Sequence, residues 1–159
     1  MHDSGFSLND GLIYLNHAAV SPWPRRTAAA VRAFADENAT LGSSRYPDWI
    51  VVESALREQL RLLVNAESAS EIALLKNTSE ALSVVAYGLP WQHGDNIVIT
   101  SQEFPSNRVV WESLAQYGVV TRAADITRAE SPEAAIIACM DAGTRLLSVS
   151  SVQYGTGLR

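Results

Sequence analysis

The sequence has 159 residues, of which 47% are hydrophobic and 18% charged, as is typical of a folded globular chain rather than a disordered one. Twelve Lys and Arg against seventeen Asp and Glu give a net charge of −5. This balance argues against nucleic acid as a partner, because phosphate binding needs concentrated positive charge. The single cysteine, Cys139, excludes an internal disulfide framework and a zinc site built from several cysteines.

The sequence carries no sign of a membrane anchor or a secretion signal. No apolar run approaches the roughly 18 residues that a transmembrane helix needs. The first four residues lack the basic and apolar regions of a signal peptide. We therefore expect a cytoplasmic protein with no membrane partner.

Residues 1–65 have the pattern of an N-terminal helical segment. Apolar residues recur at helical spacing over residues 25–40. Pro47 suits the first turn of a second helix, and an apolar stripe over residues 49–63 continues it. Two amphipathic helices are therefore expected in this part of the chain.

Residues 66–159 change to short apolar strands that alternate with helices. Strand starts recur roughly every 22 to 27 residues, the rhythm of βα units that build a mainly parallel sheet. Helices are expected between the strands, at residues 79–87 and 107–117 and from Pro132 to a stop at Gly143. The sequence therefore predicts an α/β domain. Its four expected strands are Ile72–Leu75, Ile97–Thr100, Val119–Thr121 and Leu146–Ser150.

Ligands of such sheets bind at the carboxyl ends of the strands, so the segments that follow the strands are informative. Three of them, residues 77–80, 101–107 and 151–157, are polar and rich in hydroxyl and amide groups. We expect these segments to lie together at one edge of the sheet.

Thr78 and Ser79 open a helix directly after an expected strand. The free backbone N–H groups and the helix dipole at such a position favour an anion, and the two hydroxyls add donors, so a phosphate would fit. The alternative is purely structural, with Asn77 or Thr78 as the helix N-cap and Glu80 interacting with the dipole. The sequence contains no glycine-rich loop of the ATP-binding or dinucleotide-binding kind.

Phe104 precedes a proline after the second expected strand, where a rigid aromatic ring could stack on a flat heterocycle. The alternative is a phenylalanine that only packs in the core or in a lid. His17 and His93 have no metal-ligand partner at useful spacing. Cys139 is expected to be a small buried apolar residue.

Four motifs follow one another along the chain: Tyr14–Ala19, Lys76–Leu82, Gly94–Val98 with Glu103–Asn107, and Ser151–Gly157. In this order they resemble the class V aminotransferase group of pyridoxal-phosphate (PLP) enzymes, which includes cysteine desulfurases, selenocysteine lyases and kynureninases. The resemblance extends from Tyr14 to Arg159. It implies the N-terminal part of the large domain of the PLP-dependent transferase (aspartate aminotransferase-like) fold, with an incomplete parallel sheet.

The resemblance also implies roles for four residues. Thr78 and Ser79 would hold the cofactor phosphate, Phe104 would stack on the pyridine ring, and Gln153 would approach the ring oxygen. Desulfurases of the group usually carry a histidine in the loop that here holds Phe104, whereas kynureninase-like members have Phe-Pro.

Two residues that the chemistry needs, a Schiff-base lysine and an aspartate for the pyridinium nitrogen, follow the matched region in the family. The only lysine here, Lys76, lies beside the expected phosphate loop. The sequence therefore resembles the N-terminal 40% or so of a longer enzyme. That enzyme is expected to be a homodimer acting on an amino acid by transamination, elimination or desulfuration, as a transferase or lyase.

Two other interpretations remain beside this one. A truncated, non-catalytic protein would bind phosphate or a partner chain and form no Schiff base. A small nucleotide-binding α/β domain would rest on the βα rhythm alone, and the absence of a glycine-rich loop disfavours it.

Overall fold

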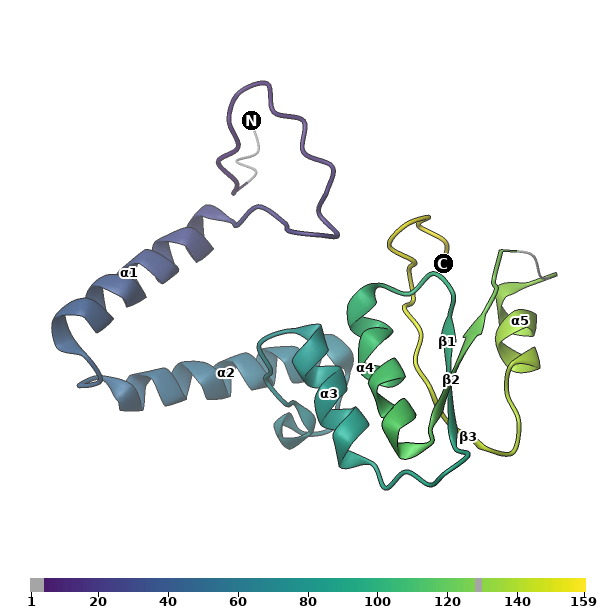
Figure 1. The fold of residues 1–159 in the computed structure, drawn as a ribbon. Helices are drawn as coiled ribbons and strands as arrows, with labels where there is room; N and C mark the ends of the chain where they lie inside the picture. The colour runs from purple at the N-terminus through teal and green to yellow at the C-terminus, as the bar shows by residue number, and fades with distance from the viewer. Residues whose placement is uncertain (1–4, 128–129) are drawn as a thin grey trace. The chain divides into compact units, whose positions relative to one another are not determined.

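The computed structural model describes residues 5–127 and 130–159 (Figure 1). These residues form two compact units, one that ends at Leu74 and one that runs from Leu75 to Arg159. No helix in the described part of the chain is long and apolar enough to cross a membrane.

The first unit contains the two expected helices, α1 (Arg25–Leu41) and α2 (Tyr46–Val64), and a short 3-10 turn, η1 (Ala69–Glu71). Pro47 lies in the first turn of α2, as its fixed φ favours. The helix is capped by Asn65, whose left-handed backbone (φ 56°, ψ 39°) turns the next N–H, that of Ala66, back onto the Arg61 carbonyl at 3.0 Å.

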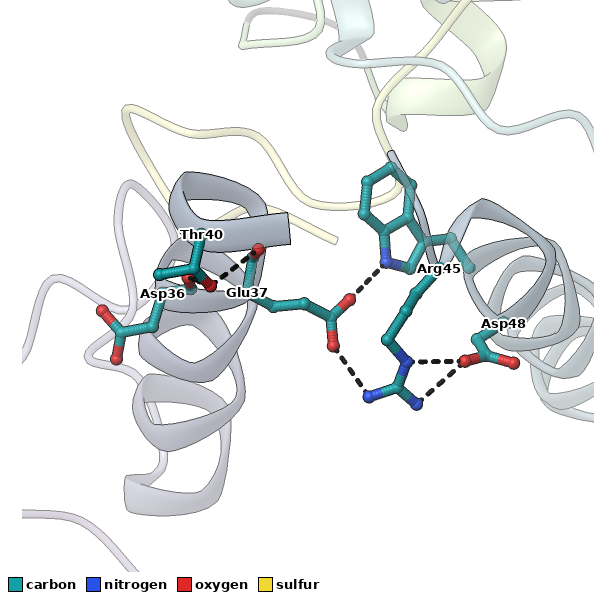
Figure 2. Close-up of polar contacts among 6 residues, drawn as sticks. Asp36, Glu37, Thr40, Arg45 and Asp48 are labelled. Carbon is teal, nitrogen blue, oxygen red and sulfur yellow. Dashed lines mark hydrogen bonds and ion pairs between the residues drawn. The ribbon is translucent and has the colours of Figure 1, made fainter. Parts of the chain in front are cut away.

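Polar side chains join α1 to α2, as Figure 2 shows. Glu37 of α1 accepts a 2.8 Å hydrogen bond from the indole Nε1 of Trp49 and a 3.1 Å ion pair from Arg45. Arg45 also binds Asp48 at 2.8 Å. The Trp49 ring packs edge-on against Phe34, with ring centroids 5.2 Å apart. One glutamate thus binds both the guanidinium of Arg45 and the indole N–H of Trp49 at the start of α2.

The second unit is an α/β layer structure built on a three-stranded parallel sheet. Its strands are β1 (Asn96–Thr100), β2 (Val120–Ala124) and β3 (Thr144–Leu147), in the order β2-β1-β3. All five residues of the central strand β1 are buried, as its unbroken apolar run predicts for a strand covered on both faces. The expected parallel α/β sheet is confirmed for these three strands.

Helices cover both faces of this sheet. Figure 1 shows α3 (Thr78–Gly88) and α4 (Val109–Glu112) on one side and α5 (Pro132–Ala138) on the other. The core between α3, α4 and the sheet contains six buried apolar residues, which exclude water from the back of β1. They are Ala86, Ile97, Ile99, Trp111, Leu114 and Val119.

The prediction of a strand at Ile72–Leu75 is wrong, because this segment is neither helical nor paired. A strand persists only where a neighbour takes up its backbone groups, and the three described strands pair among themselves. One carbonyl of the segment, that of Ile72, accepts a 3.3 Å hydrogen bond from the Arg57 side chain instead.

The single helix expected at 107–117 is also wrong. The chain forms a 3-10 turn η2 (Pro105–Asn107), the one-turn helix α4 and a second 3-10 segment η3 (Ser113–Tyr117). The Ser113 hydroxyl donates to the Val110 carbonyl three residues back, at 2.6 Å. Such side-chain bonds compete with regular helix pairing and tighten the turns.

The last helix and the last strand differ from expectation at their ends. Helix α5 stops at Ala138 rather than at Gly143, because the Asp141 side chain binds the Gly143 N–H at 2.8 Å in a separate turn. Strand β3 ends at Leu147 rather than Ser150. The N–H of Ser150 donates to the Glu103 carboxylate at 2.7 Å instead of continuing a strand ladder.

Candidate functional site

The segments that follow β1 and β3 meet at the carboxyl end of the sheet. Ser150 contacts Glu103, and the Thr156 hydroxyl donates to the Gln102 side chain at 3.0 Å. Residues about 50 positions apart in the sequence are thereby linked where parallel sheets bind ligands.

The N-terminus of α3 is formed by a cap that leaves the next two residues exposed. The Asn77 side chain accepts the Glu80 N–H at 2.9 Å, and the Glu80 carboxylate accepts the Lys76 N–H at 2.8 Å. The structural alternative is therefore correct for Asn77 and Glu80. Thr78 and Ser79 are the first helical residues and lie exposed, so their hydroxyls face solvent at the positive end of the helix.

A cavity of about 450 Å³ lies between α3 and the segment after β1. Ser79 and Phe104, two of the candidate residues, both line it. Phe104 is 52% exposed and meets the ring of Tyr154 edge to face, with centroids 5.0 Å apart. The other lining residues are mostly hydroxyl-bearing or apolar: Ser83, Tyr87, Pro105, Ser106, Val109, Val110 and Ser113.

Gln153 lines a different cavity of about 250 Å³, together with Thr100 and Ser150. Its side chain is 4% exposed. The amide oxygen accepts the Thr100 hydroxyl at 3.1 Å, and the amide nitrogen donates to the Ser150 carbonyl at 3.2 Å. Among the four candidates, the structure brings Ser79 and Phe104 into one cavity, places Gln153 in another, and leaves Thr78 outside both.

Glu103 is a buried carboxylate at this edge that the sequence interpretation did not single out. It is 6% exposed and accepts hydrogen bonds from the backbone N–H and the hydroxyl of Ser150, both at 2.7 Å. Burial opposes ionisation, but the bonds from Ser150 and other neighbours outweigh it and lower the pKa of Glu103. A carboxylate directly after an apolar strand, in a polar segment, is the sequence signal that could have pointed to it.

Asn107 holds the segment after β1 against the end of β3. It is buried, donates to the Ser148 carbonyl at 3.3 Å and accepts the indole N–H of Trp111 at 2.9 Å. It lies at the end of η2, whose N-cap is Phe104. Asn107 therefore fixes the backbone next to Phe104.

Two other residues considered from the sequence, His93 and Cys139, lie among neighbouring parts of the fold rather than at the edge of the sheet described above. A Cβ on Gly118 would lie 2.4 Å from the His93 ring, so His93 packs closely against the turn before β2. Cys139 is partly buried at the end of α5. Within residues 5–127 and 130–159, no group of three His, Cys, Asp or Glu side chains could hold a metal ion.

Comparison with known proteins gives consistent results. Residues 13–159 match the sequence profile of the family described as Aminotransferase class-V. The chain is 33% identical over 155 residues to a "Probable cysteine desulfurase" of Methanothermobacter thermautotrophicus. This match covers 91% of this chain and 37% of that protein. It is 38% identical over 108 residues to a "Cysteine desulfurase" of Pectobacterium atrosepticum, covering 65% of this chain and 26% of that protein.

Solved structures share the fold. The cysteine desulfurase CsdA of Escherichia coli superposes with a TM-score of 0.80 at 23% identity, over 96% of this chain and 41% of CsdA. The cystine C-S lyase C-DES, solved with its product cysteine persulfide, gives a TM-score of 0.74 at 20% identity, over 87% of this chain and 38% of C-DES. The chain thus spans about two fifths of the length of these proteins or less, and the expected α/β fold is confirmed. On the match over residues 13–159, the chain belongs to the class V aminotransferase family.

Proposed function

We propose that the chain is the N-terminal part of a pyridoxal-phosphate-dependent enzyme that acts on an amino acid. The observation that carries the proposal is the class V match over residues 13–159. The chain covers 37% of the Methanothermobacter relative, so the activity belongs to a longer full-length protein. The resemblance also leads us to propose a homodimer. A non-catalytic protein that only binds phosphate or a partner chain is the alternative that the experiment below tests.

The residues present fit the cofactor in two respects. Exposed hydroxyls of Thr78 and Ser79 lie at the start of an eleven-residue helix, where the dipole and free N–H groups favour an anion. Ser79 also shares its cavity with the half-exposed ring of Phe104. A phosphate and a flat ring can therefore be bound side by side. When bound, pyridoxal phosphate supplies an electron sink that stabilises negative charge on the substrate carbon.

We assign Thr78 and Ser79 to the phosphate, Phe104 to the face of the ring and Gln153 to the ring oxygen. The hydroxyls of Thr78 and Ser79 would donate hydrogen bonds to a group of nearly two negative charges. Phe104 would exclude water from one face of the ring. Gln153 would approach the ring oxygen with its side-chain amide, which is buried beside Thr100 and Ser150.

The substrate class is an amino acid, and sulfur removal from cysteine is one candidate reaction. Two relatives, at 33% and 38% identity, are named as cysteine desulfurases. The phenyl ring of Phe104 stands where such enzymes usually carry a histidine, and a phenyl ring can neither hold nor transfer a proton. Supplying the full-length protein with cysteine and a reducing thiol, which releases the transferred sulfur as sulfide, and measuring sulfide and alanine separates desulfuration from transamination.

The phosphate assignment is tested with Thr78→Ala combined with Ser79→Ala. Hydrogen bonds to charged groups contribute about 1.5–3 kcal/mol each, so the double variant should bind pyridoxal phosphate roughly a hundredfold more weakly. Phe104→Ala should cost less, about 0.5–1.5 kcal/mol. Cofactor affinity is measured by absorbance titration of the full-length apo-protein. Unchanged binding by the double variant would show that Thr78 and Ser79 are only the first residues of a helix.

A further inference from the structure

Glu103 is the buried charged group at the carboxyl end of the sheet, and both of its carboxylate oxygens bind the segment after β3. Oε1 accepts the Ser150 N–H and Oε2 accepts the Ser150 hydroxyl, each at 2.7 Å. These two bonds fix a residue 47 positions away, at the point where β3 has ended. A buried carboxylate with both oxygens hydrogen-bonded is held in one position and can accept hydrogen bonds from further donors beside it.

The same carboxylate lies beside the Gln153 amide. Gln153 Nε2 donates to Glu103 Oε1 at 3.5 Å and to the Ser150 carbonyl at 3.2 Å. Both neighbours of this atom are acceptors, whereas Gln153 Oε1 faces the Thr100 hydroxyl at 3.1 Å. The surrounding groups therefore determine which end of the amide is nitrogen and which is oxygen.

The Thr100 hydroxyl completes this arrangement. It lies 3.1 Å from Gln153 Oε1 and 3.3 Å from Glu103 Oε1, and its single proton can serve one of these acceptors at a time. The contact with Gln153 is the shorter of the two, and it places a donor beside the amide oxygen. Glu103 thus contacts Gln153 directly and also binds Ser150, whose carbonyl accepts a hydrogen bond from the amide.

We propose that Glu103 is a positioning residue that sets the orientation of the Gln153 amide, directly and through Ser150. This inference rests on the proposed function, in which Gln153 approaches the ring oxygen of pyridoxal phosphate. The lowered pKa of Glu103 is consistent with it, since an ionised carboxylate only accepts hydrogen bonds and keeps Nε2 turned toward it.

A double-mutant cycle in the full-length protein tests the inference. Glu103→Ala and Gln153→Ala should each weaken pyridoxal-phosphate binding by about tenfold, the equivalent of one charge-assisted hydrogen bond. Because both remove the same contact, the double variant should bind as weakly as Gln153→Ala alone. Both single variants should also shift the absorption maximum of the bound cofactor in the same direction, which a loss of stability alone would not do.

Two further variants complete the design. Glu103→Gln keeps the shape and one acceptor oxygen but loses the charge, so it should fold and bind pyridoxal phosphate about threefold more weakly. This loss should vanish in the Gln153→Ala background. Ser79→Ala, on α3 and in the other cavity, is the matched control, and its effect should multiply with that of Glu103→Gln.

The possible results separate the inference about Glu103 from the proposed function on which it rests. Independent, multiplying losses from Glu103→Ala and Gln153→Ala would overturn the inference while the proposed function stands. Wild-type affinity in Glu103→Gln would overturn it as well. A full-length protein that fails to bind pyridoxal phosphate at all would overturn the proposed function and this inference with it.

Discussion

At the scale of single residues, Asp141 shows how one exposed carboxylate can organise a turn. One oxygen accepts the Asn96 amide and the Gly143 N–H, both at 2.8 Å, and the other pairs with Arg122 at 2.6 Å. The Asn96 bond comes first among the causes that lower the pKa of Asp141, followed by Arg122 and Gly143. The turn before β3 is therefore linked to both β1 and β2.

This arrangement predicts an acid-sensitive contribution to stability. Because the folded pKa lies below the ordinary value of 3.8, the contribution is complete above that value and is lost as the pH falls through the folded pKa. Asp141→Asn should remove it. The free energy of urea unfolding is measured for both proteins between neutral pH and about pH 2. Parallel pH profiles for wild type and Asp141→Asn would contradict the prediction, and Asp36→Asn on α1 is the control.

At the scale of elements, α1 and α2 depend on Glu37 for their polar contact. Its side chain is 23% exposed and accepts bonds from Trp49 and Arg45 (Figure 2). Glu37→Ala removes the acceptor of a part-buried indole N–H, which should cost about 1–2 kcal/mol of unfolding free energy. Glu37→Gln keeps an acceptor oxygen and should cost less. Urea unfolding followed by circular dichroism measures both.

A matched control for Glu37 lies on α2 itself. Glu53 forms an i,i+4 ion pair with Arg57 on the helix surface, and such pairs contribute about 0.3–0.5 kcal/mol. Glu53→Ala should therefore be much milder than Glu37→Ala. Equal losses from the two alanine variants would mean that the Glu37 contact contributes no more than a surface ion pair.

Elements with a strong local pattern could be predicted from the sequence, and those that depend on distant partners could not. The burial of β1 and the start of α2 follow from an apolar run and a proline, both local features. Residues 72–75 have an equally apolar pattern but no strand beside them in the described structure. The helix expected at 107–117 changes to a 3-10 segment at Ser113, whose side chain binds the Val110 carbonyl, a bond that periodicity does not reveal.

The candidate site likewise contains residues that could be predicted from the sequence and residues that could not. The helix start at Thr78 and Ser79 could be found from the sequence because capping residues and a following helix are adjacent in the chain. For Glu103 the sequence shows a carboxylate after an apolar strand, but its role could not be assigned, because Ser150 and Gln153 approach it only once β1 and β3 have paired. Buried polar contacts between distant segments need the fold before they can be recognised.

At the scale of the whole molecule, much apolar surface stays exposed for a chain with this composition. Neither α1 nor α2 contains a buried residue. On α2, Val51 and Val52 are each 68% exposed and Leu63 is 79% exposed. In the second unit, Val120 of β2 and Leu147 of β3 are 52% and 43% exposed. Exposed apolar side chains in such number promote association.

We therefore expect the 159-residue chain to self-associate when it is purified by itself. Its sedimentation coefficient should rise with protein concentration, and the chain should bind a hydrophobic dye. Val51→Gln combined with Leu63→Gln should reduce both effects with little change in unfolding free energy, because these side chains are already in water in the folded chain. Gln59→Ala, at an exposed polar position of the same helix, should leave association unchanged. A chain that sediments as a monomer at every concentration, without dye binding, would show that these apolar side chains do not drive association.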